Sequence, residues 1–408
     1  MAFLWGSFCS SAGGVAGVED VVDLMSPKDR KQLSQLEAAV ISGVREQLPA
    51  GVTLSQMMVA DEINEWRLQN SGDADRIAVH TPTVLIHGYA ASSMAFHLNV
   101  AGLSNAFSDL CVVDLPANGL SREPPMLGPK VKGQPVHWKE LDKKTGSLTV
   151  VCEPPSKMSS SGVLDDPGVY EDYFVDRIEK WRLAHGFDNI NVVGHSFGGY
   201  MSFKYAIKYS KHVDKLVLLS PLGVERNIDS VSNKWDVGKT YDLTDIDATS
   251  PLYYRPFTVP GYLFNNQLNV LRKMGPLGNH MAKRAIASRY SNVPGTAYHA
   301  YLHHVFYGAH TFPSANITAF THLFTRQLLA RDPLLDNIQR LKVNKLMMVY
   351  GDHDWMNKEA GYGMVQEINK ERYVPAKAVY AELPSAGHNL FLDNPSGFNK
   401  LLIDFLRD

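Results

Sequence analysis

Short, uninterrupted apolar runs recur along this chain and predict its main strands. Runs without the alternation of a half-exposed strand are typical of parallel strands buried on both faces of a sheet. Between them, segments such as Tyr170–His185 place Phe174, Ile178 and Trp181 on one side of a helix. The pattern therefore predicts an α/β fold with a mostly parallel sheet and helices on both faces. The runs lie at 83–86, 110–115, 190–193, 215–220, 345–350 and 378–383.

The same alternation of strands and helices divides the chain into four parts. The region at about 124–168 is rich in Gly, Pro, Lys and Ser, and we expect an inserted, partly mobile loop there with a short hairpin at 147–152. The predicted parts are an N-terminal tail and helix at 1–50, the first part of the core at 51–221, a helical lid at 222–344 and the second part of the core at 345–408.

The lid prediction depends on where the alternation stops. Residues 222–344 hold helical patterns and many aromatic side chains, and they are inserted between two strands of the sheet. The simpler interpretation is that these aromatics form the core of the insertion itself. As a whole, however, an apolar cap over a site at the strand ends favours a lipid or another long-acyl substrate.

The strongest candidate for chemistry is a serine on a sharp turn. Gly194-His195-Ser196-Phe197-Gly198 follows a predicted strand and precedes a predicted helix. A nucleophile on such a turn has a strained backbone that requires small neighbours, which explains Gly194 and Gly198. The alternative is a purely structural turn. The strand–turn–helix context favours Ser196 as the nucleophile.

A base and an orienting acid are expected downstream, in the chain order serine, acid, histidine. The strand at 345–350 ends at Gly351-Asp352-His353-Asp354, and we select Asp354 over Asp352 because the chain turns before it presents that side chain. The strand at 378–383 leads to a loop that carries His388. The alternative for His388 is an ordinary surface-loop histidine, so its position carries the assignment.

Two backbone amides are needed to hold an oxyanion. One is expected from Phe197, which follows the nucleophile, and the other from Tyr89 in the small-residue loop after the strand at 83–86. This loop begins at His87-Gly88, and although His87 could be mistaken for a base, a histidine directly before this glycine is expected to fix the loop by hydrogen bonds.

Composition and charge exclude several other classes of protein. With 40 Lys and Arg against 42 Asp and Glu, the formal net charge is −2, and nothing favours nucleic-acid binding. The three cysteines have no metal-ligand spacing and form no disulfide framework, which fits a reducing compartment. His299 and His303 lie four residues apart, but no third ligand completes a metal site. No metal or cofactor is therefore expected.

Targeting signals are weak. The first basic residue is Lys28, so residues 2–18 fit neither a secretory signal nor a mitochondrial presequence well. A disordered tail and a weak membrane-touching segment both remain open. The sequon at Asn316 is interpreted as accidental. We expect a cytoplasmic protein or one peripheral on an intracellular membrane, with a mitochondrial location possible, and not a secreted protein.

Three longer motifs make the chain resemble the α/β-hydrolase superfamily over about residues 50–408. They also resemble a lipid-acting subfamily that includes N-acyl-phosphatidylethanolamine lipase, the coactivator of adipose triglyceride lipase and the fungal cardiolipin-specific deacylase. The motifs are Glu171–Arg182 leading into Gly194–Gly199, Tyr350–Met356 and Ala386–Asp393.

The resemblance implies an enzyme acting on acyl esters of glycerophospholipids or lysophospholipids, at a membrane or lipid-droplet surface. The coactivator of the subfamily lacks the serine, so Ser196 favours hydrolysis here. His388 and Asp393 match a His-x4-Asp motif associated with acyl transfer to a lyso-lipid. The loop at Tyr89 and the turn at 116–119 hold fewer glycines than the family usually has, and we expect both to reshape the acyl entrance. A serine esterase for small soluble esters and a lipid-binding coactivator without turnover remain the alternatives.

Overall fold

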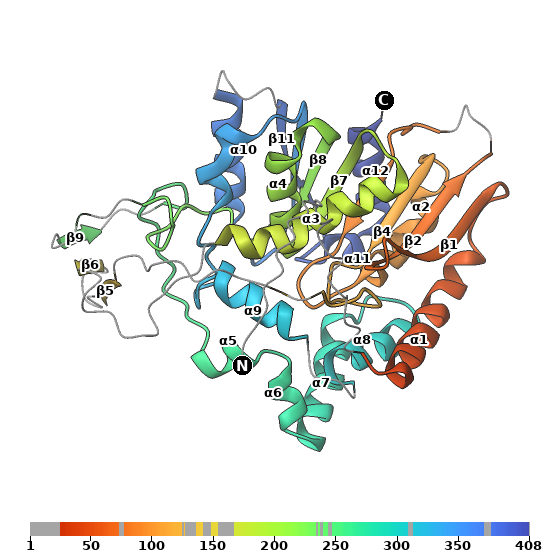
Figure 1. Cartoon of the computed structure of the whole chain (residues 1–408), viewed down its shortest axis with the longest axis horizontal. Helices are drawn as coiled ribbons and strands as arrows, with labels where there is room; N and C mark the ends of the chain where they lie inside the picture. Colours follow the sequence, from red (N-terminus) through yellow and green to blue (C-terminus); the bar gives the residue numbers. More distant parts are fainter. Residues whose placement is uncertain are drawn as a thin grey trace, which may run out of the picture.

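A computed structural model describes most of the chain (Figure 1). The expectations for residues 1–24, and those for most of the inserted loop at 124–168, lie outside the described residues. The described residues are 25–72, 77–124, 126, 136–141, 148–153, 167–233, 236, 240–243, 247–308, 313–370 and 377–407.

An eight-stranded sheet forms the centre of the molecule, in the order β1-β2-β4-β3-β7-β8-β10-β11. Its first strands pair antiparallel, and every pairing from β4 to β11 is parallel. The strands are β1 Val52–Val59, β2 Ile63–Asn70, β3 Thr83–Ile86, β4 Asp109–Val113, β7 Ile190–His195, β8 Val213–Leu219, β10 Lys345–Gly351 and β11 Lys377–Leu383. The mostly parallel sheet predicted from the apolar runs is confirmed.

Helices cover both faces of this sheet (Figure 1). Successive strand residues point to opposite faces, so Val84 and Ile86 belong to one apolar core whereas Leu85 belongs to the other. Both faces are therefore buried, which explains the uninterrupted apolar runs. The helices outside the insertion are α1 Pro27–Arg45, α2 His97–Leu103, α3 Pro167–His185, α4 Phe197–Lys208, α10 Lys358–Lys370, α11 Leu390–Asp393 and α12 Pro395–Leu406.

A small second sheet lies apart from the first (Figure 1). β5 Val136–Leu141 and β6 Leu148–Glu153 pair as an antiparallel hairpin, near the position expected for one. β6 also pairs with β9 Thr240–Leu243. The sequence did not predict β9, because a four-residue strand in the segment expected to be helical carries no periodic signal of its own.

Between β8 and β10, the described residues form five α-helices, which lie beyond one end of the sheet's strands (Figure 1). Phe320 and Leu323 join the core that contains Val84, whereas Tyr301 and Leu302 join the core that contains Leu85. The insertion is thus anchored to both cores. Its helices are α5 Gly261–Asn266, α6 Asn269–Lys273, α7 Pro276–Arg289, α8 Ala297–Tyr307 and α9 Ser314–Leu323. Among the helices that the structure describes, none has the length and apolarity needed to cross a bilayer.

Asn316 ties α9 to the turn that follows β4. Its side chain is 2% exposed and donates a hydrogen bond of 2.9 Å to the carbonyl oxygen of Ala117. An asparagine held in this way has no room for a glycan, which agrees with the interpretation of its sequon as accidental.

Glu37 joins α1 to β2 and α8 through a buried polar cluster. Its Oε2 accepts hydrogen bonds from Gln56 Nε2 at 2.9 Å and Trp66 Nε1 at 3.3 Å, and its Oε1 lies 3.4 Å from the hydroxyl of Tyr301. Burial, together with the charge of Asp114, raises the pKa of Glu37 well above its ordinary value of 4.5. The Tyr301 hydroxyl donates to Ser92 Oγ at 2.6 Å, so its oxygen can accept the proton of a neutral Glu37.

We expect Glu37→Gln to raise the unfolding temperature at pH 8 and to leave it unchanged near pH 4. A carboxyl whose pKa is raised by folding contributes stability below its unfolded-state pKa and loses that contribution as pH rises through the folded value. The glutamine amide can replace the protonated carboxyl against Tyr301 without titrating. Thermal unfolding followed by circular dichroism across pH tests this, with the exposed Glu46→Gln as control. A shift that is the same at both pH values, or equal in the control, would contradict the prediction.

Candidate active site

Ser196 lies on the turn between β7 and α4, with the strained backbone expected of a nucleophile. Its φ is +53°, which side chains other than glycine rarely adopt. A Cβ at Gly194 would lie 2.1 Å from Ser202 Oγ, and one at Gly198 would lie 2.2 Å from the carbonyl oxygen of His87. Both flanking glycines are therefore required because helix α4 packs closely on the sheet.

The structure brings the three predicted residues together from the ends of three strands. His388 Nε2 lies 3.1 Å from Ser196 Oγ, and His388 Nδ1 lies 3.2 Å from Asp354 Oδ1. Ser196 follows β7, Asp354 follows β10, and His388 lies in the loop after β11. This is the hydrogen-bond geometry of a nucleophile, a base and an orienting acid. Their catalytic roles stay a prediction.

The two aspartates of the turn after β10 have different surroundings. Asp354 has a fully buried side chain and also accepts the amide of Met356 at 3.0 Å. Burial alone would raise the pKa of Asp354, but the hydrogen bonds from His388 and the Met356 amide, together with the attraction of the His388 ring, outweigh it and lower that pKa. Asp352 instead accepts the amides of Ala386 and Ser385 at 2.9 and 3.0 Å, so it holds the His388 loop. The choice of Asp354 therefore agrees with the geometry.

The loop after β3 approaches the candidate nucleophile closely. A Cβ at Gly88 would lie 2.8 Å from His195 Nδ1 and 3.1 Å from the Cβ of Ser196, so a larger residue there would force these side chains to shift. Tyr89 and Ser196 line one pocket, and the Tyr89 ring packs edge-on against Phe197 at a centroid distance of 5.7 Å. Phe197 is the first residue of α4, where an amide has no acceptor within its own helix. The loop and the helix start thus border the Ser196 hydroxyl, as an oxyanion hole requires.

His87 fixes this loop, as expected. The Leu115 amide donates to its Nε2 at 2.9 Å, so Nδ1 carries the proton and donates to the Gly88 carbonyl oxygen at 2.7 Å. Burial lowers the pKa of His87, which keeps the ring neutral. His87 is therefore part of the loop scaffold.

The two segments that hold fewer glycines than the family resemblance leads one to expect each contain an alanine in a left-handed conformation. Ala90 has a φ of +55° and Ala117 a φ of +61°. The departures noted in the sequence therefore keep the backbone conformation of a glycine but add a methyl group and some strain.

Sequence reasoning did not assign roles to His195 and Ser220. His195 donates a hydrogen bond of 2.8 Å to the carbonyl oxygen of His388, and burial lowers the pKa of His195 to about 3, so it stays neutral. Ser220 follows β8, is fully buried and has a φ of +44°. Its amide donates a hydrogen bond of 2.7 Å to the carbonyl oxygen of Val349, which places Ser220 beside the strand that leads to Asp354. In the sequence, only position could have drawn attention to these residues: His195 directly precedes the nucleophile, and Ser220 follows the next strand.

Asp393 contacts the backbone of the loop that carries His388. Its Oδ2 accepts the Gly387 amide at 2.8 Å, at the end of the short helix α11. In the His-x4-Asp pair, the aspartate thus holds the backbone of the loop that carries His388.

A pocket of about 270 Å³ opens above Ser196 and is lined mainly by apolar side chains. One wall comes from the inserted helices and the other from the core. Arg289 is the charged side chain in this lining other than the histidines. The wall contributed by the insertion consists of Leu222, Arg289, Tyr290, Tyr298, Leu302, Phe306, Phe320 and Leu328.

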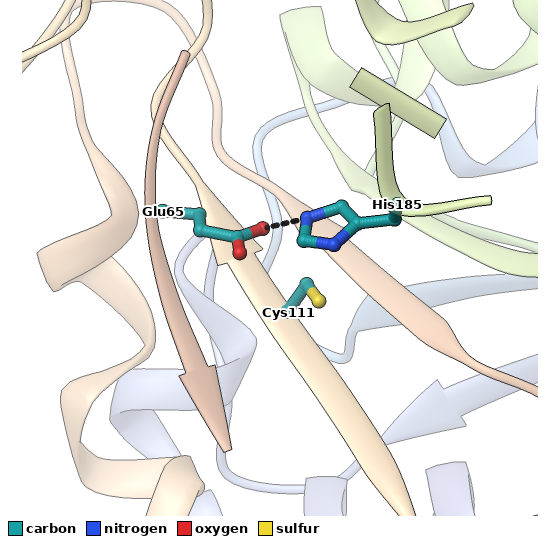
Figure 2. A group of neighbouring side chains, drawn as sticks. All are labelled: Glu65, Cys111 and His185. Atoms are coloured by element: carbon teal, nitrogen blue, oxygen red, sulfur yellow. Dashed lines mark hydrogen bonds and ion pairs between the residues drawn. The ribbon is translucent and has the colours of Figure 1, made fainter. Parts of the chain in front are cut away.

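Glu65, Cys111 and His185 form a second buried cluster, between β2, β4 and the end of α3 (Figure 2). Arg67 Nη1 lies 3.2 Å from His185 Nδ1, and because a guanidinium only donates, His185 Nε2 carries the proton and donates to Glu65 Oε2 at 3.0 Å. Burial raises the pKa of Cys111 well above its ordinary value, which opposes the thiolate that a metal needs. The cluster therefore fits a structural hydrogen-bond network better than a metal centre.

The two histidines four residues apart on α8 form separate hydrogen bonds. His299 Nε2 lies 2.9 Å from the carbonyl oxygen of Tyr290, and His303 Nε2 lies 2.7 Å from Asn279 Oδ1. These contacts are with different partners and direct neither ring toward a common ligand.

A nucleophile elbow at the carboxyl edge of a mostly parallel sheet, with an acid and a histidine after later strands, defines the α/β-hydrolase class. A family model described as alpha/beta hydrolase fold matches residues 81–395, and the chain belongs to this family. The family predicted from the sequence motifs is confirmed.

Two yeast proteins are similar to most of this chain. The 1-acylglycerol-3-phosphate O-acyltransferase ICT1 of Saccharomyces cerevisiae is 44% identical over 357 residues, which cover 87% of this chain and 88% of that protein. Protein ECM18 of the same organism is 44% identical over 348 residues, covering 85% and 75%. Among solved structures, carboxylesterase CesB from Bacillus subtilis has a TM-score of 0.51 at 14% identity, covering 93% of this chain and 98% of that chain, which shows the shared fold.

Proposed function

We propose that this protein is a serine hydrolase that cleaves acyl esters of phosphate-bearing glycerolipids through an acyl-enzyme. The observation that carries the proposal is the chain of contacts from Asp354 through His388 to Ser196 at the floor of an apolar pocket. The relative named as an acyltransferase for 1-acylglycerol 3-phosphate supports a glycerolipid substrate over a small soluble ester.

In the proposed mechanism, His388 Nε2 removes the proton of Ser196 as its oxygen attacks the ester carbonyl. Asp354 keeps the proton of His388 on Nδ1 and stabilises the ring when it becomes charged. The backbone amides of Tyr89 and Phe197 donate hydrogen bonds to the negatively charged oxygen of the tetrahedral intermediate. His388 then returns the proton to the leaving alcohol, and the acyl group stays on Ser196.

The acyl-enzyme can pass its acyl group to water or to another alcohol. A lyso-lipid hydroxyl that enters the position of the attacking water would be activated by His388 in the same way. Acyl transfer therefore needs no second catalytic centre. Because Asp393 is bound to the backbone of the His388 loop, we assign it a positioning role in both reactions.

The inserted helices are proposed to act as a lid that selects the acyl chain. Their apolar side chains form one wall of the pocket over Ser196, where they can bury the chain at about 0.8 kcal/mol per methylene. Arg289 lies at the end of α7 in the same wall, and we assign it to the phosphate of the substrate. A peripheral position at a membrane or lipid-droplet surface fits this substrate.

We expect Arg289→Gln to lower kcat/KM for a short-chain 1-acylglycerol 3-phosphate by about tenfold or more, because a charge-assisted hydrogen bond to the phosphate is lost. The matching neutral 1-acylglycerol should be hydrolysed at an unchanged rate. Both substrates are used as monomers below their micelle concentration. Arg284→Gln, on the exposed part of the same helix, is the matched control. Equal losses on both substrates would remove Arg289 from phosphate recognition.

Labelling by a fluorophosphonate probe, followed by analysis of the lipids released from a mixed phospholipid extract, tests the function as a whole. Labelling at Ser196 with release of fatty acid supports the proposal. Hydrolysis confined to short soluble esters would favour the small-esterase alternative. Absence of labelling in the folded protein would favour the lipid-binding coactivator.

A further inference from the structure

The inserted segment has an unusual charge composition. Residues 248–331 contain no Asp or Glu, although acidic and basic residues are nearly balanced over the whole chain at 42 and 40. A cationic surface can therefore form here even though the chain as a whole carries almost no net charge. The basic residues of this segment are Arg255, Arg272, Lys273, Lys283, Arg284, Arg289, Arg326 and Arg331.

The same segment exposes large apolar side chains to solvent. Most of the large hydrophobic residues that are exposed in the described part of the chain fall between 257 and 281. They lie on and around α5, α6 and α7, which extend away from the sheet (Figure 1). We call this surface the α5–α7 face. Its apolar members are Phe257, Tyr262, Leu263, Met274, Leu277 and Met281.

Helix α7 shows how apolar and basic residues share this face. Gly278, Ala282 and Ile286 form its buried stripe. Leu277, 58% exposed, and Met281, 44% exposed, lie one turn apart on the other side, with Arg284 in line at the next turn. A helix that exposes apolar residues beside a cation is typical of a surface that binds another molecule or a membrane.

Other contacts place basic groups directly among the apolar ones. Lys273 Nζ lies 5.6 Å from the centre of the Tyr262 ring and 2.7 Å from Asn266 Oδ1, so α5 and α6 present a cation beside an exposed aromatic. Lys283 and Arg284 are both exposed on α7. The cations therefore lie among and beside the protruding apolar groups, as in protein segments that insert at the boundary between headgroups and acyl chains.

We propose that the α5–α7 face docks on an anionic phospholipid bilayer. The apolar side chains would enter the upper acyl region while Lys273, Lys283 and Arg284 contact the headgroup phosphates. The absence of acidic residues in the segment removes the repulsion that such a surface would otherwise cause. Because α7 runs from this face to Arg289 and Tyr290 at the pocket, docking would bring the membrane to the pocket entrance.

Vesicle sedimentation of the full chain tests this docking. The protein should bind phosphatidylcholine–phosphatidylserine vesicles at least tenfold more strongly than phosphatidylcholine vesicles, and the difference should shrink as salt is raised. Lys283→Gln/Arg284→Gln should lower the anionic affinity about tenfold or more, and Leu277→Ser/Met281→Ser should lower it for both vesicle types. Circular dichroism confirms that each variant is folded.

The control variants change residues that are far from the α5–α7 face in the sequence. Lys342→Gln/Lys345→Gln removes the same charge, and Leu183→Ser removes an apolar side chain that is 60% exposed. Neither should change binding. Equal binding to neutral and anionic vesicles, equal binding to a triacylglycerol emulsion, or unchanged binding in both α7 variants would overturn the proposal. So would a dimer that the Leu277→Ser/Met281→Ser change dissociates, because the face would then be a protein interface.

Docking and catalysis can fail separately. Hydrolysis of a soluble short-chain ester should be the same in the docking variants and in the unmodified protein. If no ester is hydrolysed but vesicle binding follows the pattern above, the proposed function fails and the docking surface stands. If ester hydrolysis is normal and vesicle binding does not depend on the α5–α7 face, the docking surface fails alone.

Discussion

Ser196→Ala should lower ester hydrolysis by about 10³-fold or more while leaving the fold intact. The hydroxyl is the only group removed, and its structural partner is His388 Nε2 at 3.1 Å. The turn itself is held by the Ser196 amide, which donates to the Leu219 carbonyl oxygen at 2.9 Å, and by the flanking glycines. Activity that survives would come from the oxyanion hole and substrate binding alone.

The measurement is kcat on a soluble ester, together with labelling by the fluorophosphonate probe. Ser210→Ala, in the turn after α4, controls for the loss of a hydroxyl elsewhere on the same connection. Thermal unfolding and vesicle binding of Ser196→Ala should match the unmodified protein. A folded Ser196→Ala variant that retained near-normal turnover would remove Ser196 from the mechanism.

The sheet could be predicted because its physical cause is local. Strands such as β3 and β8 are buried on both faces, so each is a continuous apolar run that stands out from the chain around it. The elbow at Ser196 was predictable for the same reason, since the glycines needed for close packing lie within two residues of it.

Other features depend on contacts that a pattern cannot reveal. Ser220 lies beside the strand that leads to Asp354 only because β8 and β10 are adjacent in the sheet. His195 contacts His388, which lies far away in the sequence, and β9 is defined by pairing with a strand that is also distant in the sequence. Arg289 lines the pocket only because of the way in which helix α7 packs. In each case the residue can be seen in the sequence, but nothing in the sequence indicates which part of the chain it contacts.

The two aspartates after β10 allow a sharp comparison, because they differ in role but lie two residues apart. Asp354→Asn should lower kcat by about 10⁴-fold. The asparagine amide would donate to His388 Nδ1, which forces the proton onto Nε2, and a protonated Nε2 cannot accept the proton of Ser196. Asp352→Asn should cost about tenfold or less, because its remaining carbonyl oxygen can still accept one of the Ser385 and Ala386 amides.

Turnover of a soluble ester measured from pH 6 to about pH 9 distinguishes a wrong tautomer from a displaced loop. The Asp354→Asn enzyme should regain part of its activity at high pH, as hydroxide replaces the missing base in activating Ser196. The Asp352→Asn enzyme should keep the pH profile of the unmodified protein and lose thermal stability instead, since Asp352 holds the His388 loop through its backbone. If Asp352→Asn proved the more damaging change to kcat, Asp352 rather than Asp354 would be the residue that orients His388.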